Sequence, residues 1–132
     1  MNKLMQQLRD RSEIRGRENE LKVDWNNRKI RFDRRFTCHD KYGRTIEITP
    51  VFYIDTRPTE WGNDPIVTSP YVNNYPALGH TNHLFNDHSL CLGHNLARLD
   101  LHSLLRQIEK WFGGFYEWTQ TGVFPQSALV YS

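Results

Sequence analysis

Residues that could do chemistry concentrate in one short segment, from His80 to His94. Four of the six histidines and one of the two cysteines of the chain lie in this segment. Histidine and cysteine are side chains that can act as bases, nucleophiles or metal ligands near neutral pH. The clustering therefore predicts a functional site, and two chemistries compete for it.

The first chemistry is nucleophilic catalysis by Cys91. A thiolate attacks a carbonyl group readily and also leaves readily, so a cysteine suits acyl transfer through a thioester. A nearby histidine lowers the pKa of such a thiol, and an asparagine amide can hold the oxyanion of the tetrahedral intermediate. The candidates for these supporting roles are Asn82, Asn86, His83 and His88. The opposing interpretation is that Cys91, which stands between two leucines, is a buried core residue.

The second chemistry is zinc binding. His80 and His83 form one closely spaced pair and Cys91 and His94 form another, so four ligands could close a tetrahedron. Zinc would occupy the Cys91 thiolate, so this interpretation and acyl transfer exclude each other. Other chemistries have less support, because the chain has neither the G-x-S-x-G elbow of hydrolases nor a glycine-rich phosphate-binding motif.

The basic N-terminal region is predicted to be a helix over residues 3–22. Apolar residues recur at helical spacing from Leu4 to Leu8, and Gly16 is expected to weaken or interrupt the helix. Residues 1–35 carry eleven Lys or Arg against six Asp or Glu, whereas the rest of the chain carries six against nine. This asymmetry fits a nucleic acid or an acidic protein partner, or a solvated helix whose arginines alternate with glutamates.

Strands are predicted after this helix. β-Forming residues on both sides of a turn at 40–43 predict an antiparallel hairpin between Lys29 and Ile54. The apolar pair Ile66-Val67 predicts a third strand, and the chain that follows is rich in Pro, Gly and Asn and is expected to be irregular.

The strongest helix signal begins after Asp100, which is the predicted N-cap. Apolar residues occupy one helical face at Leu101, Leu104, Leu105, Ile108, Trp111, Phe112 and Phe115. We expect Gly113-Gly114 to bend or end this helix. The turn sequence 121–125 is expected to dock back on the core.

Together these elements predict one α+β domain over residues 1–132, with helices packed on one face of an antiparallel sheet. No apolar run approaches the roughly 20 residues that a membrane helix needs. The start of the chain lacks the apolar block of a secretory signal, and two cysteines cannot form a disulfide framework. A cytoplasmic location is the expectation.

Two short motifs resemble those of the ubiquitin-conjugating enzyme family, in particular its divergent bacterial branch. His80-Thr81-Asn82 is similar to the His-Pro-Asn tripeptide of the family, with threonine in place of proline. Leu90-Cys91-Leu92 is similar to the motif that carries the thioester cysteine. The apolar helix 104–118 and the closing segment 121–125 resemble the C-terminal part of the bacterial members. The resemblance implies an N-terminal helix, a strand meander, a long active-site loop and a major C-terminal helix.

The resemblance also implies roles for individual residues. Cys91 would form a thioester with the C-terminal carboxylate of a modifier protein, and Asn82 would brace the active-site loop or stabilise the oxyanion. His80 and Asp87 would be structural parts of that loop. His83 and His88 have no fixed counterpart in the family, and either could assist deprotonation of the incoming lysine. The N-terminal arginines, a docking surface for activating enzymes in the family, are Arg9, Arg11, Arg15 and Arg17.

The implied partners are a modifier, a target lysine and possibly an activating enzyme. The modifier would be a ubiquitin-like protein or the C terminus of a cGAS-like nucleotidyltransferase, in a bacterial anti-phage conjugation system. This reaction needs no metal or organic cofactor, no membrane and no nucleic acid. The alternatives are a zinc-stabilised binding module and a catalytically inactive adaptor of the same fold.

Overall fold

The computed structural model describes residues 3–9, 14, 16–60, 62–93 and 95–126. Its main sheet has four antiparallel strands in the order β1-β2-β5-β6, and a second sheet pairs β3 with β4. The strands are β1 (Leu21–Asp24), β2 (Lys29–Asp33), β3 (Phe36–His39), β4 (Thr45–Ile48), β5 (Val51–Asp55) and β6 (Ile66–Thr68). The helices are α1 (Lys3–Gln7) and α2 (Leu101–Thr121). The expected α+β architecture, with an antiparallel sheet and a major C-terminal helix, is therefore confirmed.

The predicted hairpin is present, and it is longer than a single pair of strands. β2 pairs with β5, and the two segments continue beyond a break as the paired strands β3 and β4. Pro50, which has no N–H to donate, lies at this break. At the tip, the Asp40 carboxylate accepts hydrogen bonds from the backbone N–H groups of Tyr42 and Arg44. Gly43 adopts the positive φ of 79° that this turn requires. The third predicted strand is also confirmed, as β6.

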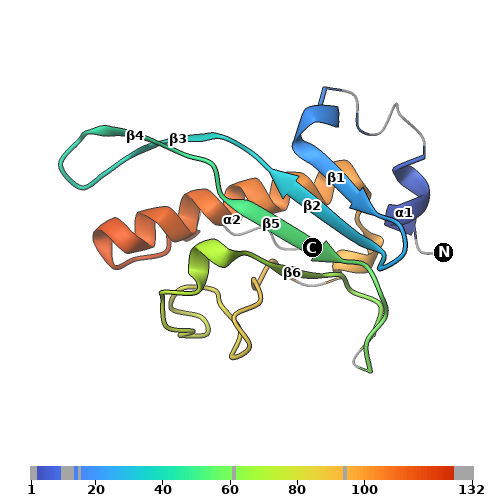
Figure 1. Cartoon of the computed structure of the whole chain (residues 1–132). Coiled ribbons are helices and arrows are strands. Elements are labelled where there is room, and N and C mark those ends of the chain that lie inside the picture. The colour runs from blue at the N-terminus through green and yellow to red at the C-terminus, as the bar shows by residue number, and fades with distance from the viewer. Residues whose placement is uncertain (1–2, 10–13, 15, 61, 94, 127–132) are drawn as a thin grey trace.

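Helix α2 covers one face of the main sheet, and the β3–β4 hairpin extends past the end of that sheet (Figure 1). The two layers meet through aromatic rings: the Phe112 ring centroid lies 4.5 Å from that of Phe36 and 6.2 Å from that of Phe52. Alternate residues of β2 and β5, such as Phe32 and Ile54, are fully buried. One hydrophobic core therefore holds sheet and helix together.

The prediction of a helix from residue 3 to residue 22 is wrong. Helix α1 ends at Gln7, and Leu21 begins β1, in which it pairs with Phe32. Gly16 has a φ of 83°, a conformation that an α-helix does not allow. Pairing with β2 gives hydrogen-bond partners to the backbone of residues 21–24 and buries Leu21. The free energy of this pairing and burial outweighs the local preference for a helix.

Of the prediction that Gly113-Gly114 bends or ends the last helix, the ending is wrong. Helix α2 begins at the predicted cap, where the Asp100 carboxylate accepts a hydrogen bond from the Ser103 N–H, and it runs through both glycines. It ends at Gly122, whose φ is 81°. Each glycine costs about 1 kcal/mol relative to alanine within a helix. The buried aromatic face on both sides of the glycines is sufficient to hold them in the helix.

The N-terminal region is attached to α2 by polar contacts as well as apolar ones. Leu4, Met5 and Leu8 are buried, and the Gln7 amide oxygen accepts a hydrogen bond of 2.6 Å from the Leu101 N–H at the start of α2. This contact satisfies one of the N–H groups that the first turn of a helix leaves free.

Among the described residues, no helix is both long and apolar enough to cross a membrane.

A cluster of ion pairs fastens the chain before β1 to the middle of α2. An Arg17 nitrogen lies 2.6 Å from one Glu109 carboxylate oxygen, and an Arg34 nitrogen lies 3.5 Å from the other. The side chains of Arg17 and Glu109 are only 17% and 19% exposed, so solvent screens this pair weakly. Glu109 therefore joins two segments that are distant in the sequence.

Replacing Glu109 with alanine is expected to lower the free energy of unfolding by about 1–2 kcal/mol, because it removes the partly buried carboxylate that pairs with both Arg17 and Arg34. Urea denaturation measures the change. The matched control is Glu117→Ala, which removes an exposed carboxylate from the same helix and is expected to change stability by less than about 0.5 kcal/mol. Equal effects of the two substitutions would contradict a stabilising role for the cluster.

Candidate active site around Cys91

The segment that carries Cys91 is held in place without regular strands. Leu84 is fully buried and forms isolated bridges with Gly79 on one side and Leu90 on the other. The Leu90 N–H donates a hydrogen bond of 2.8 Å to the carbonyl oxygen of Val67 in β6. These contacts fix the loop to the edge of the main sheet.

Cys91 lies at the boundary between core and solvent. As a residue it is partly exposed, whereas Leu90 and Leu92 on either side are buried. The Cys91 N–H donates a hydrogen bond of 3.0 Å to the carbonyl oxygen of His83. The cysteine is thus neither sealed in the core nor on a freely moving loop.

The other cysteine, Cys38, has a different environment. It lies in β3, packs against the hydrophobic core, and burial raises the pKa of its thiol. A raised pKa leaves less thiolate at neutral pH and so disfavours nucleophilic chemistry. Cys38 is therefore a strand residue packed against the core.

His83 connects the loop at Cys91, helix α2 and the closing segment 121–125. Its carbonyl oxygen accepts hydrogen bonds of 3.0 Å from both the Cys91 N–H and the Trp111 indole N–H of α2. His83 has a φ of 54°, a left-handed conformation that non-glycine residues adopt rarely. Its ring lies 4.5 Å from the Phe124 ring, so the expected docking of the closing segment takes place here.

Burial and the nearby His80 both lower the pKa of the His83 imidazole. A lowered pKa keeps the ring neutral at neutral pH, and a neutral imidazole can accept a proton. The two rings lie 6.3 Å apart between centroids. His83 thus has the protonation state that an assisting base requires, next in space to the backbone of Cys91.

The link between α2 and the loop predicts a specific effect of removing the Trp111 indole N–H. Trp111→Phe is expected to lower the free energy of unfolding by about 1–3 kcal/mol, because a buried hydrogen bond and buried ring volume are lost. The Cys91 amide should also exchange its hydrogen faster, which NMR detects. Trp25→Phe, at a half-exposed ring, is the control and should change neither quantity measurably. Unchanged exchange at Cys91 in the Trp111 variant would contradict the link.

Asn82 is fully buried, and its amide closes the turn before Cys91. The Asn82 Oδ1 accepts a hydrogen bond of 3.0 Å from the Leu78 N–H, and its Nδ2 donates one of 2.7 Å to the Pro76 carbonyl oxygen. Both ends of the amide are therefore used within the loop. This geometry supports the bracing role implied for Asn82.

His88 and Asp87 also form contacts within the loop. His88 Nε2 donates a hydrogen bond of 2.9 Å to the Tyr75 carbonyl oxygen, and His88 has a φ of 66°. The Asp87 carboxylate accepts hydrogen bonds from the N–H and the hydroxyl of Ser89, and these bonds lower the pKa of Asp87. Asn86, the remaining amide candidate, is exposed.

The zinc interpretation receives no geometric support from the described residues. His80 is exposed, and within the described part of the chain its side chain has none of the hydrogen bonds implied for a loop-fixing residue. His94 lies outside the described residues. Among the residues that are described, no group of three or more His, Cys, Asp or Glu side chains is placed to hold a metal ion.

The four arginines proposed for partner binding are not equivalent. Arg9 is exposed and lies over the Trp25 ring at 5.5 Å from its centroid. Arg17 is engaged with Glu109 and also with Glu20, at 3.1 Å, so it supports the fold. Arg11 and Arg15 lie outside the described residues. Of the two described arginines in this set, Arg9 is therefore the exposed one.

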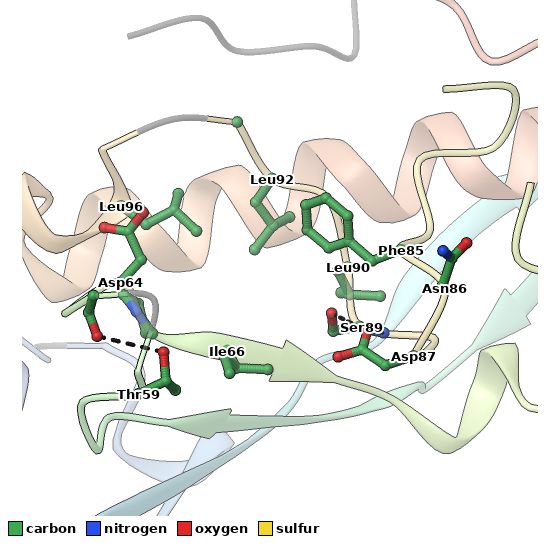
Figure 2. A pocket seen from close by; sticks show the side chains of 13 residues that line it. Thr59, Asp64, Ile66, Phe85, Asn86, Asp87, Ser89, Leu90, Leu92 and Leu96 are labelled. Atoms are coloured by element: carbon green, nitrogen blue, oxygen red, sulfur yellow. Dashed lines mark hydrogen bonds between the residues drawn. The ribbon is translucent and has the colours of Figure 1, made fainter. Parts of the chain in front are cut away.

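A pocket of about 710 Å³ is lined by Leu90 and Leu92, the chain neighbours of Cys91, although Cys91 itself does not line it (Figure 2). It opens between the chain that leads into β6 and the loop that carries the cysteine. Its lining residues are Thr59, Gly62, Asp64, Pro65, Ile66, Phe85, Asn86, Asp87, Ser89, Leu90, Leu92, Gly93 and Leu96. No local sequence pattern predicts this pocket, because its two walls come from segments about twenty residues apart.

Comparison of the chain with protein-family models, curated proteins and solved structures finds no match.

Proposed function

We propose that this protein is an acyl-transfer enzyme of the ubiquitin-conjugating type, with Cys91 as the acyl carrier. The observation that carries the proposal is the position of Cys91: a partly exposed cysteine on a loop whose backbone is fixed by His83 and whose neighbouring leucines are buried. A carrier cysteine must be accessible to a protein tail and still be held in one orientation. The buried, bracing Asn82 and the order of helix, strand meander, loop and major helix further support it.

The first step loads the cysteine. The Cys91 thiolate attacks the activated C-terminal carbonyl of the modifier, a carbon–sulfur bond forms, and the bond to the leaving group of the activating partner breaks. The modifier is a ubiquitin-like protein or a nucleotidyltransferase with a comparable C terminus. Neither reactant is oxidised or reduced, and no metal enters the step.

The second step transfers the modifier to a target. A lysine amine attacks the thioester carbonyl, an amide bond forms, and the carbon–sulfur bond breaks to return the Cys91 thiolate. The attacking nitrogen must lose a proton, which a base or water takes up. His83 is the better placed of the two histidine candidates for this assistance, because its imidazole is held neutral, whereas His88 Nε2 is engaged with Tyr75.

The test is the detection of the loaded intermediate. Tagged protein is purified from cells that also express its genomic neighbours, and it is run on denaturing gels with and without dithiothreitol. The proposal expects a slower band that disappears with dithiothreitol and in which mass spectrometry finds a foreign C terminus on Cys91. A protein that binds a modifier tightly without such a band would instead be an adaptor.

A further inference from the structure

The pocket lined by Leu90 and Leu92 has an apolar interior and an exposed aromatic ring at its edge. Its interior is apolar, because Leu90, Leu92 and Leu96 contribute buried side chains and Ile66 contributes a partly buried one. Phe85 stands at its edge with 50% of its surface exposed. An exposed aromatic ring next to an apolar hollow is surface that gains from being covered by a ligand.

The charged groups of the pocket are of one sign. Figure 2 shows Asp64 and Asp87 toward opposite ends of the pocket, with Ile66, Phe85 and Leu92 between them. Neither carboxylate forms an ion pair with a described residue, and none of the described lining residues is Lys, Arg or His. The described lining residues therefore supply no positive charge to complement the two ends of the pocket.

Both carboxylates are held in position by the backbone. Asp64 Oδ1 accepts a hydrogen bond of 2.9 Å from the Ala97 N–H, and Asp87 Oδ1 accepts one of 2.9 Å from the Ser89 N–H. The bonds to Asp87 lower its pKa, so this group is ionised at neutral pH. Fixed carboxylates at two ends of an apolar hollow are complementary to a ligand with an apolar centre and a cation on each side.

We propose that this pocket binds a segment of a partner protein in which an apolar side chain is flanked on both sides by Lys or Arg. The apolar side chain fills the hollow under Phe85, and the flanking cations meet Asp64 and Asp87. This binding function goes beyond acyl transfer and does not require the Cys91 thiol. Leu90 and Leu92, the chain neighbours of Cys91, line the pocket, whereas Cys91 itself does not.

Three matched peptides test the proposal by NMR titration of the ¹⁵N-labelled full chain. Acetyl-Lys-Leu-Lys-amide should shift the amide signals of Ile66, Phe85, Leu90 and Leu92. Acetyl-Glu-Leu-Glu-amide, which reverses the charge, and acetyl-Lys-Ser-Lys-amide, which removes the apolar centre, should shift them much less at the same concentration. Equal shifts with all three peptides, or shifts confined to other parts of the chain, would overturn the proposal.

Substitutions then assign the contacts. Asp64→Asn keeps the oxygen that accepts from Ala97 but removes the charge, and it should weaken binding of the Lys-Leu-Lys peptide about two- to fivefold. Phe85→Ala removes an exposed ring without opening the core and should weaken binding at least as much. Glu117→Gln, on the exposed side of α2, should leave binding unchanged. Undiminished binding by both pocket variants would overturn the proposal.

Cys91→Ala separates this inference from the proposed enzyme activity. The variant should bind the Lys-Leu-Lys peptide as the wild type does, because Cys91 does not line the pocket. Peptide binding without a thioester adduct would leave the pocket assigned and the acyl-transfer proposal rejected. A thioester adduct without peptide binding would reject the pocket alone.

Discussion

Cys91→Ala will abolish the dithiothreitol-sensitive adduct, and Cys38→Ala will leave it intact. Both cysteines are partly exposed residues, but Cys91 lies on an irregular loop fixed at its own backbone, whereas Cys38 packs in β3 and burial raises the pKa of its thiol. Cys91→Ser should trap the modifier as an oxygen ester, and Cys91→Lys should trap it as an amide, both stable to dithiothreitol. Non-reducing gels and mass spectrometry of the four variants measure these outcomes.

The fold must survive these substitutions for the result to be informative. Cys91 is partly exposed, so Cys91→Ala should change the free energy of unfolding by less than about 1 kcal/mol. Urea denaturation checks this for every variant. Persistence of the adduct in a folded Cys91→Ala protein would contradict the proposed enzyme, and its loss in Cys38→Ala would place the reactive thiol in β3.

Asn82→Ala is expected to cause the largest loss of stability of any single polar substitution in the loop, about 2–3 kcal/mol. The asparagine is fully buried, and truncation leaves the Leu78 N–H and the Pro76 carbonyl without their partners. Thermal or urea denaturation measures the effect. Asn86→Ala is the matched control, because this exposed asparagine stands four residues further along the same loop and should cost less than about 0.5 kcal/mol.

Asn82→Asp sharpens the same prediction through its pH dependence. The ionised aspartate still accepts from the Leu78 N–H, but it places a buried negative charge against the Pro76 carbonyl oxygen. Its pKa in the folded state should therefore rise above the ordinary value of about 3.9. Stability is then greatest below pH 4, where the protonated acid can donate to Pro76, and falls as the pH rises through the raised pKa. Stability that falls on acidification relative to wild type would contradict the bracing role.

The sequence predicted which segment would carry the candidate site, because the residue types themselves concentrate between His80 and His94. It did not predict how those side chains are used. Both ends of the Asn82 amide form hydrogen bonds with nearby backbone groups. His88 forms a hydrogen bond with Tyr75, thirteen residues earlier in the chain. Such contacts depend on the path of an irregular loop, and no periodicity in the sequence encodes that path.

The N-terminal region shows how a local signal can mislead. Leu4, Met5 and Leu8 have helical spacing and do form α1, but the chain from Leu21 onward takes its structure from its neighbour β2. Arg17, expected on a solvated helix, instead meets Glu109 of α2. The strand at Leu21 depends on pairing with β2, and the position of Arg17 depends on Glu109. Neither partner lies within a short window of neighbouring residues, so local patterns do not predict these contacts.

By itself, the sequence determined the α+β class, the hairpin turn at 40–43, the strand at Ile66 and the start of the last helix at Asp100. Each of these follows from φ/ψ preferences, caps or side-chain periodicity within a few residues. Only the tertiary structure decided that β1 is a strand, that α2 runs through Gly113 and Gly114, and that two separate segments enclose an acidic-ended apolar pocket. The physical reason is that these features are stabilised by burial and pairing between distant parts of the chain, which outweigh local preferences of about 1 kcal/mol per residue.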